Sequence, residues 1–288
     1  MASVINTNLL SLNAQRNVTT SQSSLATSLQ RLSSGLRVNS AKDDAAGLAI
    51  SERLNAQVRG SNVAIRNAND GISLAQTAEG SLSKVNDSLQ RMRELAVQAR
   101  NATNTSADKD SLDKEFGELS KEIQRVLGGT TFNGRAILAT AAAGTQTFQV
   151  GANVSSNDRI DVVTSDMTAA TEITTVAGTD NTGAGRAVID NTATGATIDT
   201  VIGNIDTAIN KVSSERATLG ASQNRFDQVI GNLQISVENQ SAAKSRITDA
   251  DFAAETANLS RANILQQAGN AMIAQANQIP SQVLSLLR

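Results

Sequence analysis

Three features of the sequence predict a mainly α-helical fold, an elongated antiparallel helical bundle or coiled coil built from both halves of the chain. Apolar residues recur at heptad spacing over long stretches, which is typical of helices packed side by side. Aromatic residues make up 2% of the 288 residues, and Leu, Ile, Val and Ala fill helix seams well without them. The single proline leaves most of the chain free to form long helices.

Charge and composition exclude several classes of function. Lys and Arg number 25 against 27 Asp and Glu, so no general affinity for nucleic acid or an anionic membrane is expected. The absence of His and Cys removes the commonest zinc ligands, general bases and thiol nucleophiles. The sequence also lacks a P-loop and a dinucleotide-binding fingerprint. We therefore expect no enzyme activity, no cofactor and no metal.

The sequence also gives no sign of a membrane protein. No apolar run approaches the ~18 residues that suggest a membrane span, so no membrane insertion is expected. The first residues lack the basic and apolar regions of a conventional secretory signal. On composition alone, the chain reads as a soluble cytosolic protein.

The first half of the chain predicts three helices. One runs over residues 6–36, and Ser40-Ala41-Lys42-Asp43 has the form of a capping box before a second helix over residues 44–100. Thr105-Ser106-Ala107-Asp108 repeats that form before a third helix, which Gly128-Gly129 is expected to stop. The turn between the second and third helices is short, so we expect them to be antiparallel neighbours.

The centre of the chain has a different composition. Residues 145–150 and 159–163 alternate between apolar and polar side chains, and predict a hairpin whose turn lies around residues 153–157. Residues 164–196 are rich in Thr, Ala, Gly, Asn and Asp. They predict a loop or a small β-rich insertion that could not build a substantial core by itself.

The second half of the chain predicts two more helices. Heptad spacing is sustained over residues 198–247, and Thr248-Asp249-Ala250-Asp251 is a third capping-box form before a last helix that begins at Phe252. An apolar seam runs from Met272 to Leu286 in that last helix. Pro280 is expected to mark a bend or a restart in it.

Both ends of the chain are apolar, and something must cover them. Near the start, Leu25, Leu29, Leu32 and Leu36 repeat at spacings of 4, 3 and 4. Each such side chain gains about 1.5–3 kcal/mol on full burial. Two functions remain open on periodicity alone. The chain is either a self-contained coiled-coil adaptor or an assembly subunit whose terminal helices are completed by neighbours.

The order of the segments is nearly palindromic, and it predicts three regions. Residues 1–42 and 250–288 form a terminal-helix domain, and residues 43–165 and 197–249 form a domain of long helices with the β-hairpin. Residues 166–196 are left as a short variable surface insertion.

Several strings at both ends of the chain closely resemble bacterial flagellin. They are QRN (15–17), RLSSGLRVNSAKDDAAGLAIS (31–51), QRMRELAVQA (90–99), FNG (132–134), FQVGAN (148–153) and SRANILQQAGNAMIAQANQIPSQVLSLLR (260–288). The resemblance implies a structural subunit that polymerises into the helical flagellar filament for swimming, with the terminal helices in its inner tube. It also implies export by the flagellar type III apparatus and an extracellular location.

The partners that the resemblance implies are further copies of the chain, an export chaperone, and hook-associated junction and cap proteins. Host sensors are also implied, namely Toll-like receptor 5 and NAIP-type proteins. A hook-associated junction protein shares the terminal architecture and is the rival interpretation. Thr and Ser in residues 164–196 are either O-glycosylated, as in some relatives, or part of a plain solvated loop.

The resemblance also assigns site residues. A receptor-recognition surface is expected at Gln90, Arg91, Leu95 and Glu115, with Met92 in place of the more usual valine. The alternative is that Leu95 and Met92 simply face the bundle. Apolar residues of both ends are expected to form the polymerisation interface, the last four of them also matching the stretch read by NAIP-type sensors. These residues are Ile5, Leu9, Leu12, Leu25, Leu29, Leu32, Leu36, Leu265, Met272, Ile279, Val283, Leu284, Leu286 and Leu287.

Overall fold

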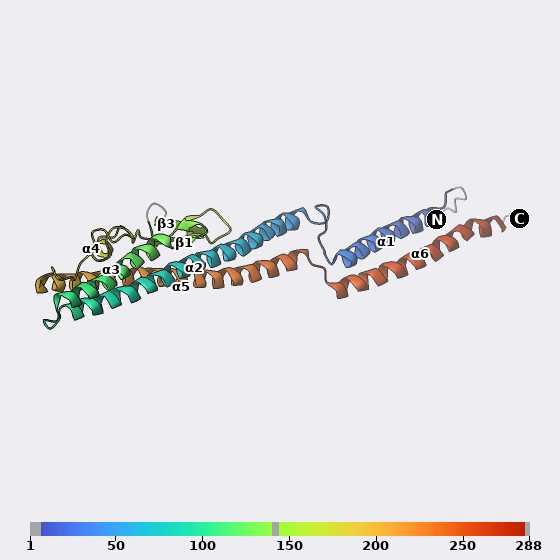
Figure 1. Ribbon diagram of the computed structural model, residues 1–288. Coiled ribbons are helices and arrows are strands. Elements are labelled where there is room, and N and C mark those ends of the chain that lie inside the picture. Colours follow the sequence, from blue (N-terminus) through green and yellow to red (C-terminus); the bar gives the residue numbers. More distant parts are fainter. Residues whose placement is uncertain (1–6, 140–143, 286–288) are drawn as a thin grey trace. The chain divides into compact units, whose positions relative to one another are not determined.

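The computed structural model describes residues 7–139 and 144–285, with side chains of the last helix described as far as Gln278. Within them the fold is mainly α-helical with a small β region, which confirms the predicted class (Figure 1). The helices are α1 (Leu9–Ser34), α2 (Ala45–Ala99), α3 (Ser106–Gly129), α4 (Thr171–Ala177), α5 (Gly195–Thr248) and α6 (Phe252–Ser285). The strands are β1 (Thr131–Phe132), β2 (Arg135–Ala136), β3 (Gly144–Gln149) and β4 (Arg159–Thr164), and the 3₁₀ helix η2 (Ser156–Asp158) precedes β4.

The chain divides into two compact units, one of Met1–Val58 with Glu238–Arg288 and one of Arg59–Val237. In the first unit, α1 packs against α6. Gly35 ends α1 with φ of 72°, a left-handed conformation that suits glycine, and its amide donates to the Arg31 carbonyl at 2.8 Å. The segment between α1 and α2 is also bonded to the junction of α5 and α6. The Arg37 amide donates to the Thr248 carbonyl at 2.7 Å, and the Ala250 amide donates to the Gly35 carbonyl at 2.9 Å.

Aspartates cap α2 and α6, four residues after Ser40 and three residues after Thr248, the caps that the capping-box patterns predict. Asp44 Oδ1 accepts from the Gly47 amide at 2.8 Å, and Asp251 Oδ1 accepts from the Ala253 amide at 2.9 Å. Ser40 instead donates to Asp43 within the turn before α2. The capping boxes predicted at Ser40 and at Thr248 are therefore wrong.

The capping box and the helix stop expected for α3 are confirmed, and the restart expected at Pro280 is wrong. Thr105 and Asp108 form a complete capping box at the start of α3. Gly128-Gly129 forms the end of α3, whose C-cap Thr130 is extended, so the predicted stop is confirmed. By contrast, α6 runs past Pro280 to Ser285, so the helix does not restart there.

The second unit has one apolar core shared by α2, α3 and α5. Arg93 Nε lies 2.6 Å from Asp206 Oδ1, and Arg100 Nε lies 2.7 Å from Asp199 Oδ1, so α2 and α5 run antiparallel. The side chains that fill this core are fully buried. The largest are Phe116, Phe226, Leu82, Leu89, Met92, Leu95, Ile123 and Leu127.

The predicted hairpin is confirmed as β3 paired with β4, in a register that runs from Gly144 opposite Thr164 to Gln149 opposite Arg159. Asn67 of α2 donates to the Gln149 carbonyl at 2.9 Å, and the ring of Phe148 meets that of Phe226 edge-on at 5.6 Å. The hairpin is thereby fixed to both long helices.

Residues 165–196, all of which the structure describes, contain α4 and loops but no strand, so the β-rich alternative is wrong. The segment packs on α3. The Ser120 hydroxyl donates to the Ala177 carbonyl at 2.7 Å, and Arg186 Nη1 lies 2.9 Å from Asp113 Oδ1. Its apolar residues have no separate core and join that of the second unit. They include Met167, Ile173, Val176 and Ile189.

Candidate functional site: the exposed faces of the α1–α6 pair

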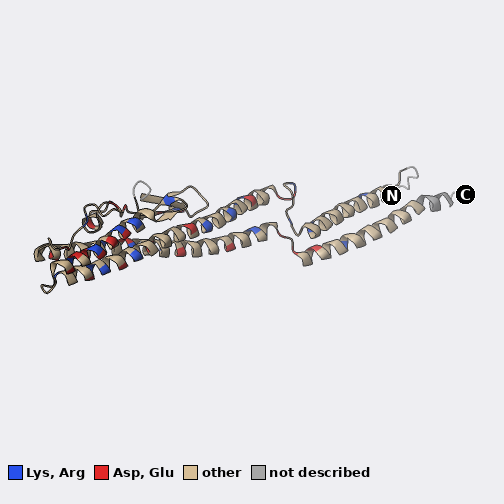
Figure 2. Ribbon diagram, in the orientation of Figure 1, with Lys and Arg blue, Asp and Glu red and all other residues tan. Residues whose placement is uncertain are grey.

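The α1–α6 pair carries few charges. Over their described lengths, α1 contains Arg16 and Arg31 as its charged residues, and α6 contains Glu255 and Arg261. Figure 2 shows this contrast with α3, where acidic and basic residues are dense. A helix pair so poor in charge depends on side-chain packing for its contacts.

The two helices cover only a narrow, regular stripe of one another. Buried and half-buried residues recur along each helix at alternating spacings of three and four, as in a heptad seam. On α1 they are Ser11, Ala14, Val18, Ser21, Leu25, Ser28 and Leu32. On α6 they are Glu255, Leu259, Ala262, Gln266, Gly269, Ile273 and Ala276.

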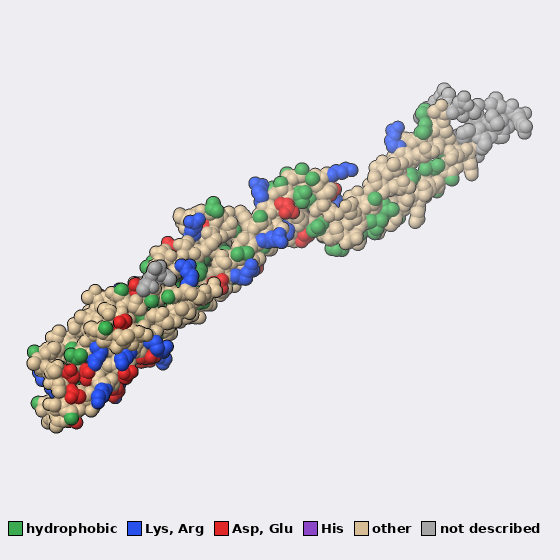
Figure 3. Space-filling view, turned by 45° about the horizontal axis from the view of Figure 1, so that its top comes forward, with side chains coloured by type: hydrophobic (Ala, Val, Ile, Leu, Met, Phe, Trp, Pro, Cys, Tyr) green, Lys and Arg blue, Asp and Glu red, His purple; other side chains and the backbone are tan. Residues whose placement is uncertain are grey.

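Large apolar side chains remain on the outside of the pair. Eight are 50–66% exposed, out of fifteen such exposed side chains in the described part of the chain. Figure 3 shows hydrophobic side chains on the surface of these two helices. Large exposed apolar side chains gathered on one pair of helices mark an interaction site in a soluble protein. The eight are Leu9, Leu10, Leu12, Leu29, Phe252, Ile264, Leu265 and Met272. We call them the outer apolar face.

An apolar groove of about 580 Å³ lies between α1 and α6 beside this face. Leu10 and Val18 line it from α1, and Leu265 and Met272 from α6. Gly269 lets the helices approach closely here, since a Cβ at that position would lie 2.4 Å from Val18 Cγ2. The groove and the outer apolar face form one surface that is suited to apolar side chains.

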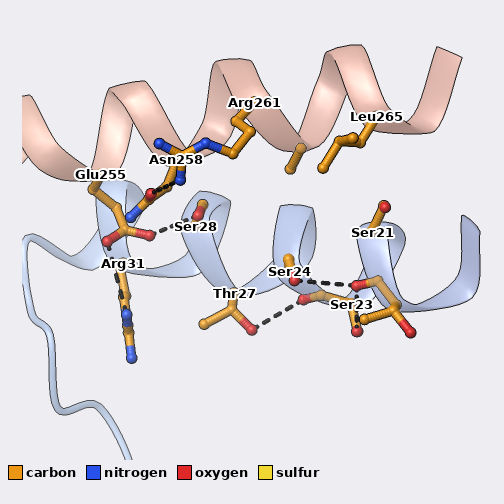
Figure 4. Close-up of a pocket in the computed structure, with 12 residues that line it drawn as sticks. Ser21, Ser23, Ser24, Thr27, Ser28, Arg31, Glu255, Asn258, Arg261 and Leu265 are labelled. Atoms are coloured by element: carbon orange, nitrogen blue, oxygen red, sulfur yellow. Dashed lines mark hydrogen bonds and ion pairs between the residues drawn. The ribbon is translucent and has the colours of Figure 1, made fainter. Parts of the chain in front are cut away.

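A second, polar pocket of about 470 Å³ lies further along the same pair (Figure 4). Its centre is Glu255, which accepts a hydrogen bond from Ser28 Oγ at 2.6 Å and lies 3.7 Å from Arg31 Nη1. Arg261 is turned toward Asn258 on its own helix at 3.0 Å. Polar contacts in this pocket therefore join α6 to α1 through Glu255.

The structure separates the predicted interface residues into three groups. Leu9, Leu12, Leu29, Leu265 and Met272 belong to the outer apolar face. Leu25, Leu32 and Leu36 are half-buried, so the predicted run of four leucines does not form one buried seam. Ile5, Leu286 and Leu287 lie outside the described residues, as do the side chains of Ile279, Val283 and Leu284.

Sequence reasoning missed three members of the face: Leu10, Phe252 and Ile264. The sequence contains a usable signal for two of them. Leu9-Leu10 and Ile264-Leu265 are adjacent apolar pairs, and neighbouring residues on a helix point about 100° apart. The two residues of such a pair cannot both lie in one narrow seam, so at least one of them faces outward.

The predicted receptor surface is only partly accessible. Gln90, Arg91 and Glu115 are exposed, and Arg91 Nε lies 2.8 Å from Glu115 Oε1. The hydrogen bonds from Arg91 to Glu115 and Glu94 raise the pKa of the guanidinium. Leu95 and Met92 are fully buried in the core, which corrects the expectation that Leu95 is a direct receptor contact. Leu95 and Met92 face the other helices of the second unit, which is the alternative stated for these two residues.

Two further properties bear on the class of protein. Among the helices that the structure describes, none is long and apolar enough to cross a membrane. The described residues also include no group of acidic side chains arranged to hold a metal ion. What they do include is a helix pair with a satisfied inner seam and a large apolar face left outside. These features define a self-associating helical subunit.

Comparison with known proteins identifies the family. Residues 5–143 match the family model of the bacterial flagellin N-terminal helical region, and residues 202–287 match that of the C-terminal helical region. The flagellin of Halalkalibacterium halodurans is 46% identical over 285 residues, which cover 99% of this chain and 100% of that protein. The flagellin of Bacillus subtilis is 42% identical over 306 residues and 99% of each chain. The chain belongs to the bacterial flagellin family and is a structural subunit of the flagellar filament.

A solved structure described as a flagellar hook-associated protein from Vibrio parahaemolyticus is similar in fold, with a TM-score of 0.59 over 72% of this chain and 100% of that one. Its identity is 14%, so it shows the fold alone. The family matches therefore favour neither the hook-associated alternative nor the coiled-coil adaptor.

Proposed function

We propose that the outer apolar face of the α1–α6 pair is the polymerisation interface, covered in the filament by neighbouring copies of the chain. The observation that carries this proposal is the placement of eight large apolar side chains on the outside of a pair that has four charged residues. Each such side chain gains about 1.5–3 kcal/mol on full burial. A few of them per contact are enough to favour assembly.

The geometry of the face suits an open polymer. A patch that contacts a different patch on the next copy generates a helical filament when the rotation does not close into a ring. The groove between α1 and α6 and the exposed side chains that do not line it, such as Leu29 and Ile264, are two such different patches. A structural role of this kind requires no catalytic group.

The same face needs cover before assembly. We propose that an export chaperone binds it in the cell, that the chain leaves through the flagellar type III apparatus, and that it then functions outside the cell. Hook-associated junction and cap proteins contact it at the filament ends. NAIP-type sensors bind the apolar stretch Val283, Leu284, Leu286 and Leu287. What supports these proposals is family membership and an apolar surface that is costly to leave in water.

The polymerisation proposal is tested by Leu10→Gln combined with Leu265→Gln. Both residues line the groove and are exposed, so the change removes apolar surface and leaves the helices intact. Loss of about 3 kcal/mol raises the critical concentration for polymerisation about 100-fold. Sedimentation of seeded filaments measures it, and circular dichroism checks that the helices remain.

The matched control is Val188→Gln, an exposed apolar residue in the loops of the other unit. It should leave the critical concentration within about twofold. A doubly substituted chain that polymerises as readily as the natural one would contradict the proposal.

Recognition by Toll-like receptor 5 is proposed to use Gln90, Arg91 and Glu115, with Leu95 supporting them from the core. The exposure of the three polar residues and the Arg91–Glu115 contact support this. Arg91→Ala should raise the half-maximal concentration in a receptor reporter assay about tenfold, since about 1.4 kcal/mol is lost with a charged contact. Lys121→Ala, an exposed charge on α3, serves as the control. Equal potency of the two variants argues against this surface.

A further inference from the structure

The inner seam of the α1–α6 pair is too uniform to fix its own register. Three of its seven positions on α1 are serines, and the α6 side includes Ala262, Gly269 and Ala276. Val18 lies opposite Gly269, and if α1 slides along α6 by one heptad, about 10 Å at 1.5 Å per residue, large residues again face small ones, with Leu25 opposite Gly269 and Val18 opposite Ala276. Packing alone therefore distinguishes poorly between the two registers.

One charged side chain interrupts this uniformity. Glu255 is the charged residue among the buried residues of the described α1 and α6, with an exposed fraction of 8%. Its carboxylate meets α1 through two groups, the Ser28 hydroxyl at 2.6 Å and the Arg31 guanidinium at 3.7 Å (Figure 4). Ser28 is itself buried, so each of the two polar groups satisfies the other.

We propose that Glu255, through Ser28 and Arg31, fixes the antiparallel register of α1 against α6. A slide of one heptad that brings Leu25 opposite Gly269 carries Ser28 and Arg31 away from Glu255 and puts Gly35 and Val38, which have no side-chain donor, in their places. It leaves a buried carboxylate without a partner, which is costly even though large residues still face small ones. Buried charged groups contribute little net stability, and the fixing of register is their best-attested role in coiled coils.

Register matters because it decides what the outer face presents. Leu10 and Val18 on α1 flank one groove with Leu265 and Met272 on α6, and it is the observed register that brings these four residues together. The effect of Glu255 on assembly rests on the proposed function of the outer apolar face. Its effect on register does not, because register is a property of the single chain.

Engineered disulfides report the register directly, since the chain contains no Cys. Val18 Cβ lies 3.7 Å from the position of a Cβ on Gly269, close to the ~3.8 Å mean of protein disulfides. Val18→Cys with Gly269→Cys therefore closes in the observed register. Leu25→Cys with Gly269→Cys requires a slide of one heptad.

Disulfide formation in the free chain under mild oxidation is the measurement. In the otherwise natural chain, the native-register pair should close with a yield at least about tenfold above that of the shifted pair. Glu255→Ala should reduce this ratio to within about threefold. Glu255→Gln keeps an acceptor for Ser28, so it should retain more of the preference than alanine. Arg261→Ala, a charge change on the same helix at a residue that hydrogen-bonds to Asn258 of α6, should leave the ratio unchanged.

An unchanged ratio in Glu255→Ala overturns the proposal, and so does failure of the native-register pair to close in the otherwise natural chain. Assembly provides a second arm. If Glu255→Ala polymerises poorly, closing the native-register disulfide should restore polymerisation. If it does not, the link between register and assembly is wrong. Failure of the proposed function itself appears separately, as normal polymerisation of the Leu10→Gln and Leu265→Gln chain.

Discussion

At the scale of single residues, the contact between Asp113 and Arg186 holds the central segment on α3. Both side chains are largely buried, with 12% and 19% of their surface exposed. Burial by itself raises the pKa of Asp113. Hydrogen bonds from Arg186 and from the Ile189 amide, together with the charge of Arg186, outweigh it and leave the pKa below its ordinary 3.8. The folded state therefore favours the ionised carboxylate.

Arg186→Met should destabilise the second unit by about 3 kcal/mol at pH 7, because it leaves the buried Asp113 without its partner. A lowered pKa means that the stabilisation is fully present above the unfolded value of 3.8 and is lost as pH falls through the folded value. The difference between the two chains should therefore shrink at about pH 2.5. Urea unfolding at both pH values measures it.

The control for that substitution is Arg125→Ala, which removes an exposed pair with Glu122 on α3. Exposed pairs of this kind contribute about 0–1 kcal/mol. Equal urea midpoints for the Arg186 variant and the natural chain at pH 7 would show that the segment is held by its apolar residues alone.

The helix caps show why residue-level prediction succeeds in some places and fails in others. The Ser/Thr-x-x-Asp pattern predicts hydrogen bonds between its first and last members, and at Ser40 and Asp43 these bonds form. The helix nevertheless begins beyond them, because Asp44 can also cap and is one residue closer to the apolar stretch. At Thr105 the helix begins directly after the first member of the pattern, and the predicted box is the real one.

At the scale of elements, two glycines in α2 have opposite consequences. Gly71 lies under the ring of Phe226 of α5, and an added Cβ would be 2.6 Å from Phe226 Cζ. A Cβ at Gly80 would meet nothing within 4 Å. Gly71 therefore permits a close approach of α2 and α5, whereas Gly80 only adds backbone entropy to the unfolded chain.

Gly71→Ala should lower the free energy of unfolding by about 1–3 kcal/mol through overpacking against Phe226. The matched control, Gly80→Ala, should raise it by about 0.5–1 kcal/mol because the helix propensity improves without a clash. Thermal unfolding followed by circular dichroism measures both. A stabilising Gly71→Ala would indicate that Phe226 moves aside at little cost.

Element order and type could be predicted from the sequence, because heptad spacing is a strong signal in long helices. Which face of a helix is buried could not always be predicted. In α1 the seam is built from Ser11, Val18, Ser21 and Ser28 as much as from leucines, so hydrophobicity alone selects the wrong stripe. One of the four leucines in the predicted repeat, Leu29, belongs to the outer apolar face. An assembly subunit has two apolar faces per helix, and periodicity does not say which is inside.

At the scale of the whole molecule, charge is balanced at neutral pH, with 25 basic and 27 acidic side chains. This balance lets copies of the chain approach without net repulsion. Carboxylates ordinarily titrate near pH 4, so acid leaves a strongly positive chain. Two aspartates of the second unit, Asp113 and Asp199, have lowered pKa values through contacts with arginines and remain charged further into acid.

Filaments should therefore dissociate as pH is lowered toward about 3, while the helices of the second unit persist. The cause is repulsion between positive subunits, which acts at the interface before the internal ion pairs of α2, α3 and α5 are lost. Electron microscopy reports the filaments, and circular dichroism of the same samples reports the helices. If repulsion is the cause, about 1 M salt, which shortens the Debye length to about 3 Å, should preserve filaments at that pH. Filaments that survive at pH 3 in low salt, or that dissociate equally in high salt, would show that charge does not control assembly.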